Sequence, residues 1–140
     1  MSRTQLVNSL EERYGVLQDA SRVAAQAEED VLRNKARLAY AERVLDELTV
    51  RLVADAPDTC KNEVQRKAYA LEQGREAAVE VEALRQAHLE SEINRVWARH
   101  YYRIADDLRR FLELMVTMAD LPDDALLVPA LPGLPSTDVS

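Results

Sequence analysis

The sequence predicts an all-α protein: a long antiparallel two-helix coiled-coil hairpin, followed by a flexible, proline-rich acidic C-terminal tail. Three observations support this fold class. Residues 3–55 and 61–119 each contain no proline and one glycine. Apolar residues recur at heptad or helical spacing in both segments. Aromatic residues make up only 5% of a chain dominated by Ala, Leu, Glu and Arg, which is typical of long helices.

The first helix is expected over residues 3–55 because two rows of positions follow a heptad repeat. The first row is apolar throughout and consists of Leu10, Leu17, Ala24, Val31, Leu38, Leu45 and Leu52. The companion row consists of Leu6, Arg13, Ala20, Ala27, Asn34, Ala41 and Leu48. These rows are the a and d positions of a coiled coil, and the alanines predict a closely approaching partner helix. The polar residue Asn34 favours a single register.

The segment DAPDTCKN, residues 55–62, is expected to connect two helices. Pro57 ends the first helix because it lacks an N–H group and disfavours helical backbone at the preceding residue. Asn62, with Gln65 three residues later, is a candidate N-cap for the second helix, and Asp58 and Thr59 are alternatives. So short a connection joins antiparallel neighbours.

The second helix is expected over residues 61–119, with a helical stripe that forms its core face. This stripe consists of Val64, Ala68, Leu71, Ala78, Leu89, Ile93, Val96, His100, Ile104, Leu108, Phe111, Met115 and Met118. Trp97 and Tyr101 lie beside the stripe and are expected to be core residues too. If the chain turns near residue 58, paired residues have numbers that add to about 116, which places Trp97 opposite the Ala20 region.

Residues 120–140 differ in composition from the helical domain, residues 1–119. They contain four Asp residues and no Lys or Arg, and Pro129, Pro132 and Pro135 recur at three-residue spacing. This spacing favours polyproline II and no packed core. The tail is expected to be either a flexible end or a partner-binding peptide that docks through its prolines.

The helical domain has a thin core for its length, so a homo-oligomer is expected. Cys60 is the only cysteine, which fits a reducing compartment. No secretion signal and no apolar stretch of membrane-spanning length is visible. The expected location is therefore the cytoplasm, or the host cytoplasm if a phage encodes the chain, with no membrane contact.

No catalytic or cofactor motif occurs in the sequence. The phosphate-binding glycine loops and the nucleophile-elbow motif are absent. His88 and Glu92 have a spacing that could hold a metal ion, but two ligands are too few. His100 lacks a suitable partner, and Cys60 has no neighbouring His or Cys. We therefore expect a protein that is not an enzyme and uses neither a metal nor another cofactor.

The segment 94–111 concentrates arginine and aromatic residues in a chain of net charge −7. Its candidate nucleic-acid-binding residues on the outer side of the helix are Arg95, Arg99, Tyr102, Arg103 and Arg110. A ridge of arginines beside an aromatic ring can follow a phosphate backbone while a base stacks. The alternative is an exposed helix with ordinary ion pairs, such as Asp106 with Arg110 and Arg103 with Asp107.

A second basic cluster opens the second helix at Lys61, Arg66 and Lys67. Cations in a first helical turn interact unfavourably with the helix dipole, so a role in binding is one explanation for their presence. The alternative is that they are solvated residues at the start of a helix, beside Glu63.

The start KNEVQRKA, with Lys61, Asn62, Arg66, Lys67 and Ala68, resembles the second-helix start of small all-helical proteins of tailed phages. In size and helicity the chain is also similar to UvsY-type recombination mediators. The resemblance covers residues 5–118 as architecture and only this short segment as a motif. It implies a ring-forming accessory protein that binds single-stranded DNA and recombination proteins.

Two functions remain open at this point. The first is a recombination or replication accessory protein that binds single-stranded DNA through the two basic clusters. The second is a protein-interaction module, such as a scaffold, an assembly factor or an inhibitor of a host machine, which binds an unidentified protein and no nucleic acid.

Overall fold

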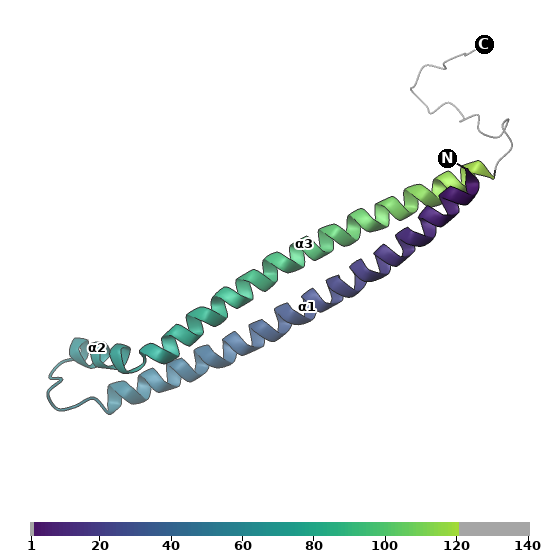
Figure 1. Cartoon of the computed structure of the whole chain (residues 1–140). Coiled ribbons are helices and arrows are strands. Elements are labelled where there is room, and N and C mark those ends of the chain that lie inside the picture. Colours follow the sequence, from purple (N-terminus) through teal and green to yellow (C-terminus); the bar gives the residue numbers. More distant parts are fainter. Residues whose placement is uncertain (1, 121–140) are drawn as a thin grey trace, which may run out of the picture. The chain divides into compact units, whose positions relative to one another are not determined.

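The computed structural model describes residues 2–120, which form three helices (Figure 1): α1, Arg3–Ala54; α2, Glu63–Gln73; and α3, Arg75–Ala119. No strand occurs among these residues, so the all-α class is confirmed, and the long helices are consistent with the predicted hairpin. Pro129, Pro132 and Pro135, with the rest of the predicted tail beyond Asp120, lie outside the described residues. The described chain divides into two compact units, residues 20–102 and the paired segments 2–19 and 103–120.

Local side-chain contacts explain where the helices begin. At the start of α1, the backbone N–H of Gln5 donates to Ser2 Oγ (3.2 Å), and the N–H of Ser2 donates to Gln5 Oε1 (2.8 Å). At the start of α2, the N–H of Gln65 donates to Asn62 Oδ1 (2.8 Å). Each contact satisfies a backbone donor that has no partner within the helix. Of the three candidate N-caps, Asp58, Thr59 and Asn62, the structure has Asn62 in that position.

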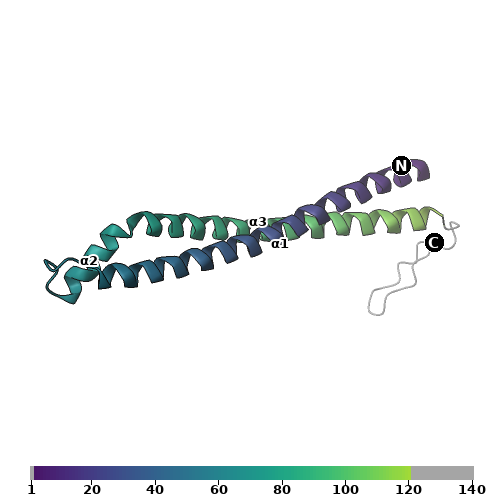
Figure 2. The same cartoon turned by 90° about the horizontal axis from the view of Figure 1, so that it is seen from below.

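The predicted single helix over residues 61–119 is divided at Gly74 into α2 and α3. Gly74 is buried, and a side chain there would place its Cβ 3.0 Å from the carbonyl oxygen of Ala70. The N–H of Gly74 donates to Ala70 (2.9 Å), while its carbonyl accepts from Ala78 (3.0 Å). Glycine therefore permits a tight change of direction, and Figure 2 shows that α2 and α3 are not collinear.

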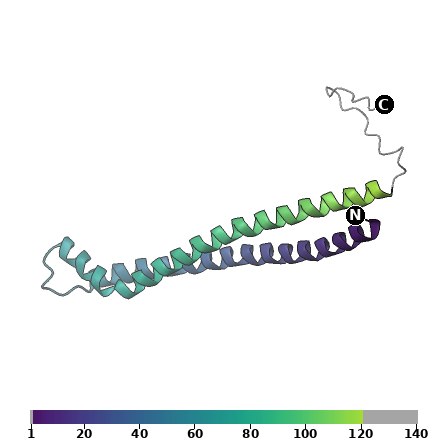
Figure 3. The same cartoon turned by 45° about the horizontal axis from the view of Figure 1, so that its top comes forward.

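The inner face of α1 agrees with the heptad prediction. Every position of the two predicted rows is buried or half-buried. The most enclosed side chains of these rows are Leu6, Ala20, Ala27 and Val31. Within each unit, these positions face the only other long helical segment, which runs antiparallel alongside α1 (Figure 3).

The inner face of α3 differs from the prediction. The inward row has seven-residue spacing and consists of Ala70 in α2 and Ala77, Leu84, Ser91, Ala98, Ala105 and Leu112 in α3, all buried or half-buried. The large apolar residues expected in the core are mostly exposed instead, including Trp97, His100, Tyr101, Ile104, Leu108 and Phe111. The inner face of α1 also carries small, enclosed residues, Ala20 and Ala27, so the helices can approach closely.

The predicted register was also wrong. Asn34 donates through Nδ2 to the carbonyl of Ala87 (3.4 Å), and Arg85 Nε lies 3.3 Å from Glu42 Oε1. Both partners on α3 lie at least five residues further along the chain than a turn near residue 58 requires. The prediction assumed one straight second helix, whereas the chain breaks at Gly74 and α2 is not collinear with α3.

Replacing a buried alanine of the seam by leucine tests the close approach of the helices. Ala20 is fully buried, whereas Ala25 of the same helix is exposed. Ala20→Leu is expected to lower the free energy of unfolding by about 1–3 kcal/mol, because the added atoms have no space. Ala25→Leu should change it by less than about 0.5 kcal/mol. Urea unfolding followed by circular dichroism measures both, and equal stability of the two variants would contradict the close packing.

Candidate functional site

The outer face of α3 within residues 20–102 carries a stripe of large apolar side chains, here called the Trp97 face. It consists of Leu89, Ile93, Val96, Trp97 and Tyr101, each between 49% and 66% exposed. Their spacing of three and four residues places them along one side of the helix. This side is opposite the row of Ser91 and Ala98, which faces α1.

A second stripe lies on α3 within the other unit and is here called the Phe111 face. It consists of Ile104, Leu108, Phe111, Leu114 and Met118, each between 40% and 58% exposed. The buried Ala105 and the half-buried Leu112 lie on the inner side of the same segment. In this unit too, a stripe of large apolar residues lies outside, and the most enclosed residue of α3 is the small Ala105.

Exposure on this scale is unusual for a surface that meets only water. Single exposed apolar residues are ordinary, but contiguous patches beyond roughly 300–600 Å² are rare on monomers and mark interaction sites. Each stripe contains five large side chains with two fifths or more of their surface exposed. The two faces are therefore the strongest candidates for a functional surface in the described residues.

Two of the predicted DNA-binding arginines of residues 20–102, Arg95 and Arg99, are engaged by one carboxylate. Glu28 of α1 forms ion pairs with Arg99 and, at 3.8 Å, with Arg95 Nη1. The Arg95 side chain is half-buried, so its prediction as an outer residue was wrong, since it lies four residues after Ser91 on the inner face. Its Nε has no hydrogen-bond partner among the described residues, and the same is true of His88 Nδ1.

The other predicted residues of the arginine ridge belong to different surroundings. Tyr102 lies at the edge of the inner face and is 38% exposed. Arg103 and Arg110 are exposed and lie in the unit of residues 103–120. Arg110 forms the predicted ion pair with Asp106 (3.1 Å), whereas Arg103 forms no ion pair with Asp107.

The second predicted cluster, Lys61, Arg66 and Lys67, is exposed in the connection and α2. Lys67 pairs with Glu63 (3.1 Å). It also borders an apolar hollow of about 400 Å³ that Thr49, Val50, Val53 and Leu71 line. Twenty residues of α3 separate Arg75 from Arg95, about 30 Å at 1.5 Å per residue, so the structure does not combine the two clusters into one site.

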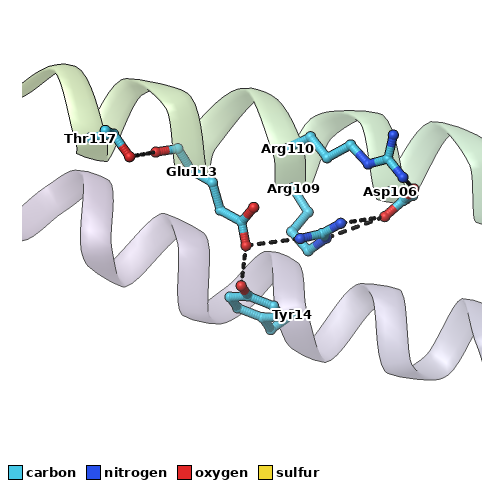
Figure 4. A network of polar contacts seen from close by, with 6 residues as sticks. All are labelled: Tyr14, Asp106, Arg109, Arg110, Glu113 and Thr117. Atoms are coloured by element: carbon cyan, nitrogen blue, oxygen red, sulfur yellow. Dashed lines mark hydrogen bonds and ion pairs between the residues drawn. The ribbon is translucent and has the colours of Figure 1, made fainter.

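The most extensive polar network lies within residues 2–19 and 103–120 and centres on Arg109 (Figure 4). Its guanidinium donates to Asp106 Oδ1 (2.7 Å) and to Glu113 Oε1 (2.8 Å), with 18% of the side chain exposed. The Tyr14 hydroxyl of α1 donates to the same Glu113, and the guanidinium lies 5.8 Å from the Tyr14 ring centroid. A charge held in this way favours one pairing of the two helices.

The network changes the acidity of its members. The hydrogen bond from Arg109 lowers the pKa of Asp106 below its ordinary value of 3.8. The hydrogen bond from Tyr14, with a further one from Arg109, lowers the pKa of Glu113 below 4.5. The same contacts, that of Asp106 first, raise the pKa of Arg109.

Arg109, Tyr14 and Glu28 were not among the predicted site residues, because the core of the second helix was expected to consist of the large apolar residues. The missing signal was the small-residue row with seven-residue spacing, which includes Ala98 and Ala105. Arg109 lies four residues after Ala105 and so belongs to the inner face. The seven-residue recurrence of these small residues, rather than hydrophobicity, would have identified that face.

The described residues contain neither a candidate metal-binding group nor a candidate membrane-spanning helix. Among residues 2–120, no group of three or more His, Cys, Asp and Glu side chains is placed to hold a metal ion. No helix in this range combines the length and the apolar character that crossing a bilayer requires. Comparison with protein families, curated proteins and solved structures finds no significant match to this chain.

Replacing Arg109 tests the half-buried network through its pH dependence. The pKa values of Asp106 and Glu113 are lowered by folding, so their contribution to stability is complete above the ordinary carboxyl values and is lost as the pH falls below them. Arg109→Met should therefore be less stable than the unmodified chain at neutral pH and should lose less stability on acidification.

Urea unfolding at about pH 7 and about pH 3 measures this difference. Arg110→Met is the matched control because Arg110 also pairs with Asp106 but lies 68% exposed. A stronger effect from the control variant would show that Arg109 is not the centre of the network.

Proposed function

We propose that the chain is a non-enzymatic helical interaction module that binds a partner helix along the outer face of α3. The observation that supports this most directly is the exposure of the Trp97 face, whose central residue is 66% exposed. Amphipathic helices bind partners through apolar anchors spaced three and four residues apart, which is the spacing of Ile93, Val96, Trp97 and Tyr101.

The separation of the two faces of α3 supports the proposal. The inner face meets α1 through Ser91 and Ala98, so a partner could cover the outer face without disturbing the hairpin contacts. Tryptophan and tyrosine are also enriched among the residues that dominate the energy of protein interfaces. Trp97 and Tyr101, four residues apart, are thus the expected centre of the contact.

Binding of single-stranded DNA is the second proposal, and the contacts of the arginines give it less support. Arg95 and Arg99 share the carboxylate of Glu28, so a phosphate would have to compete with an existing ion pair. Arg66 and Arg103 are exposed and form no ion pair with another described residue. The chain also carries a net charge of −7, which does not attract a polyanion.

A charge placed on the Trp97 face tests the first proposal. Trp97→Glu is expected to abolish co-purification of the partner from the source cells, because a carboxylate would be buried without a counter-ion at the centre of the contact. The fold should persist, with a change in the free energy of unfolding within about 0.5 kcal/mol.

Asn94→Glu is the matched control, because Asn94 is an exposed polar residue only three positions from Trp97 on α3. It adds the same charge to the same helix and should retain the partner. Recovery of the same proteins with Trp97→Glu as with Asn94→Glu would refute the role of the Trp97 face.

Fluorescence anisotropy of a labelled single-stranded oligonucleotide tests the second proposal. If interaction with protein is the function, anisotropy should stay flat at both about 50 and about 200 mM salt. Binding at low salt that collapses at high salt and weakens in Lys61→Ala, Arg66→Ala and Arg103→Ala would instead favour the DNA-binding hypothesis.

A further inference from the structure

The Phe111 face is exposed in the single chain, and the residues around it indicate which partner covers it. Its apolar centre consists of Ile104, Leu108 and Phe111, each at least 40% exposed. One edge of this centre carries Asp107 and Arg110, three residues apart on the helix. Set antiparallel against a copy of itself, this surface would bring apolar residues against apolar residues and acidic residues against basic ones.

We propose that the occupant is a second copy of this chain, whose residues 103–114 pack antiparallel on the same residues about a two-fold axis between Leu108 and Arg109. This inference deepens the proposed interaction function by naming a partner for one face, and it rests on that proposal.

The charges at the edge of the face support this axis. In an antiparallel helix pair related by a two-fold axis, equivalent edges of the two helices face each other. An axis between Leu108 and Arg109 brings Asp107 of each copy opposite Arg110 of the other. Two opposite-charge contacts form at once, and neither sets like charges against each other.

Both residues are available for such contacts. Asp107 forms no ion pair with another described residue, although arginines precede and follow it on the helix. Arg110 is 68% exposed and uses one guanidinium nitrogen for Asp106 (3.1 Å). A guanidinium carries five N–H donors, so Arg110 retains donors for a second carboxylate.

The positions of the apolar residues also fit a two-fold axis between Leu108 and Arg109. With this axis, Phe111 of one copy fits between Ile104 and Leu108 of the other, and the reverse contact is identical. A large side chain thus enters a hollow between two residues one helical turn apart, as in knobs-into-holes packing.

The local charge is compatible with self-association. From Arg103 to Glu113 the chain carries three arginines and three acidic residues. Two copies of this segment therefore meet without the repulsion that the net charge of −7 would suggest. A nucleic acid would find no net positive charge here, which favours a protein occupant.

Disulfide trapping tests both the partner and its direction. In a Cys60→Ser background, which removes the only native cysteine, Leu108→Cys should form a disulfide-linked dimer under mild oxidation, since the two residues lie beside the axis. Met118→Cys is the matched control on the same face. Its two copies would lie about 28 Å apart along antiparallel helices at 1.5 Å per residue and should not be linked.

Charge reversal provides a second, reversible measurement. Asp107→Arg should raise the dimer dissociation constant in sedimentation equilibrium about tenfold, because two attractive contacts become repulsive. Adding Arg110→Asp to it restores opposite charges across the axis and should return the constant to within about threefold of the original.

The outcomes separate this inference from the proposed function. Efficient linkage of Met118→Cys would overturn the antiparallel arrangement and indicate parallel helices. A chain that stays monomeric at high-micromolar concentration would overturn the second copy as the occupant. If the monomeric chain still binds a protein and Trp97→Glu does not, the proposed interaction function is retained. If the chain neither dimerises nor binds a protein, both proposals are wrong.

Discussion

The close approach of α1 to α3 along a row of small side chains is the constraint on which the rest of the structure depends. Ala98 and Ala105 are at most 5% exposed and give α3 an inner surface with little relief. Ala20 and Ala27 on the inner face of α1 are also small and at most 2% exposed, so the two helices approach closely. Because alanines occupy the inner side, the bulky side chains of α3 remain on the opposite side. The exposed stripes therefore follow from the way the two helices pack.

Polar residues in this seam specify how the helices pair. Arg109 is held by Asp106 and Glu113, and Tyr14 of α1 joins the same network. Asn34 reaches the backbone of Ala87. Such groups are costly to bury without partners, and a shifted register would remove those partners. A seam of alanines alone would permit several registers of similar energy, so these polar contacts supply the specificity that the small apolar residues lack.

Much of the fold could be predicted from the sequence because local rules determine it. The heptad rows identified the inner face of α1, and Asn62 with Gln65 identified the start of α2. The inner face of the second helix could not be predicted from hydrophobicity. Trp97 and Phe111 are larger and more apolar than Ala98 and Ala105, yet the two alanines are the buried residues. The break at Gly74 depends on a close backbone contact that one glycine does not reveal. The pairing of Arg95 and Arg99 with Glu28 depends on the register, which differs from the predicted one because the second helix is divided at Gly74.

The central claim is that the large side chains of α3 point away from α1, and the only tryptophan of the chain makes it measurable. Acrylamide quenching of Trp97 fluorescence, at a concentration where the chain is a monomer, reports the exposure of this one side chain. We expect a quenching constant close to that of the same chain unfolded in urea, since Trp97 is 66% exposed. A constant several-fold lower, with emission shifted to shorter wavelength, would place Trp97 in the helix–helix core and contradict the account.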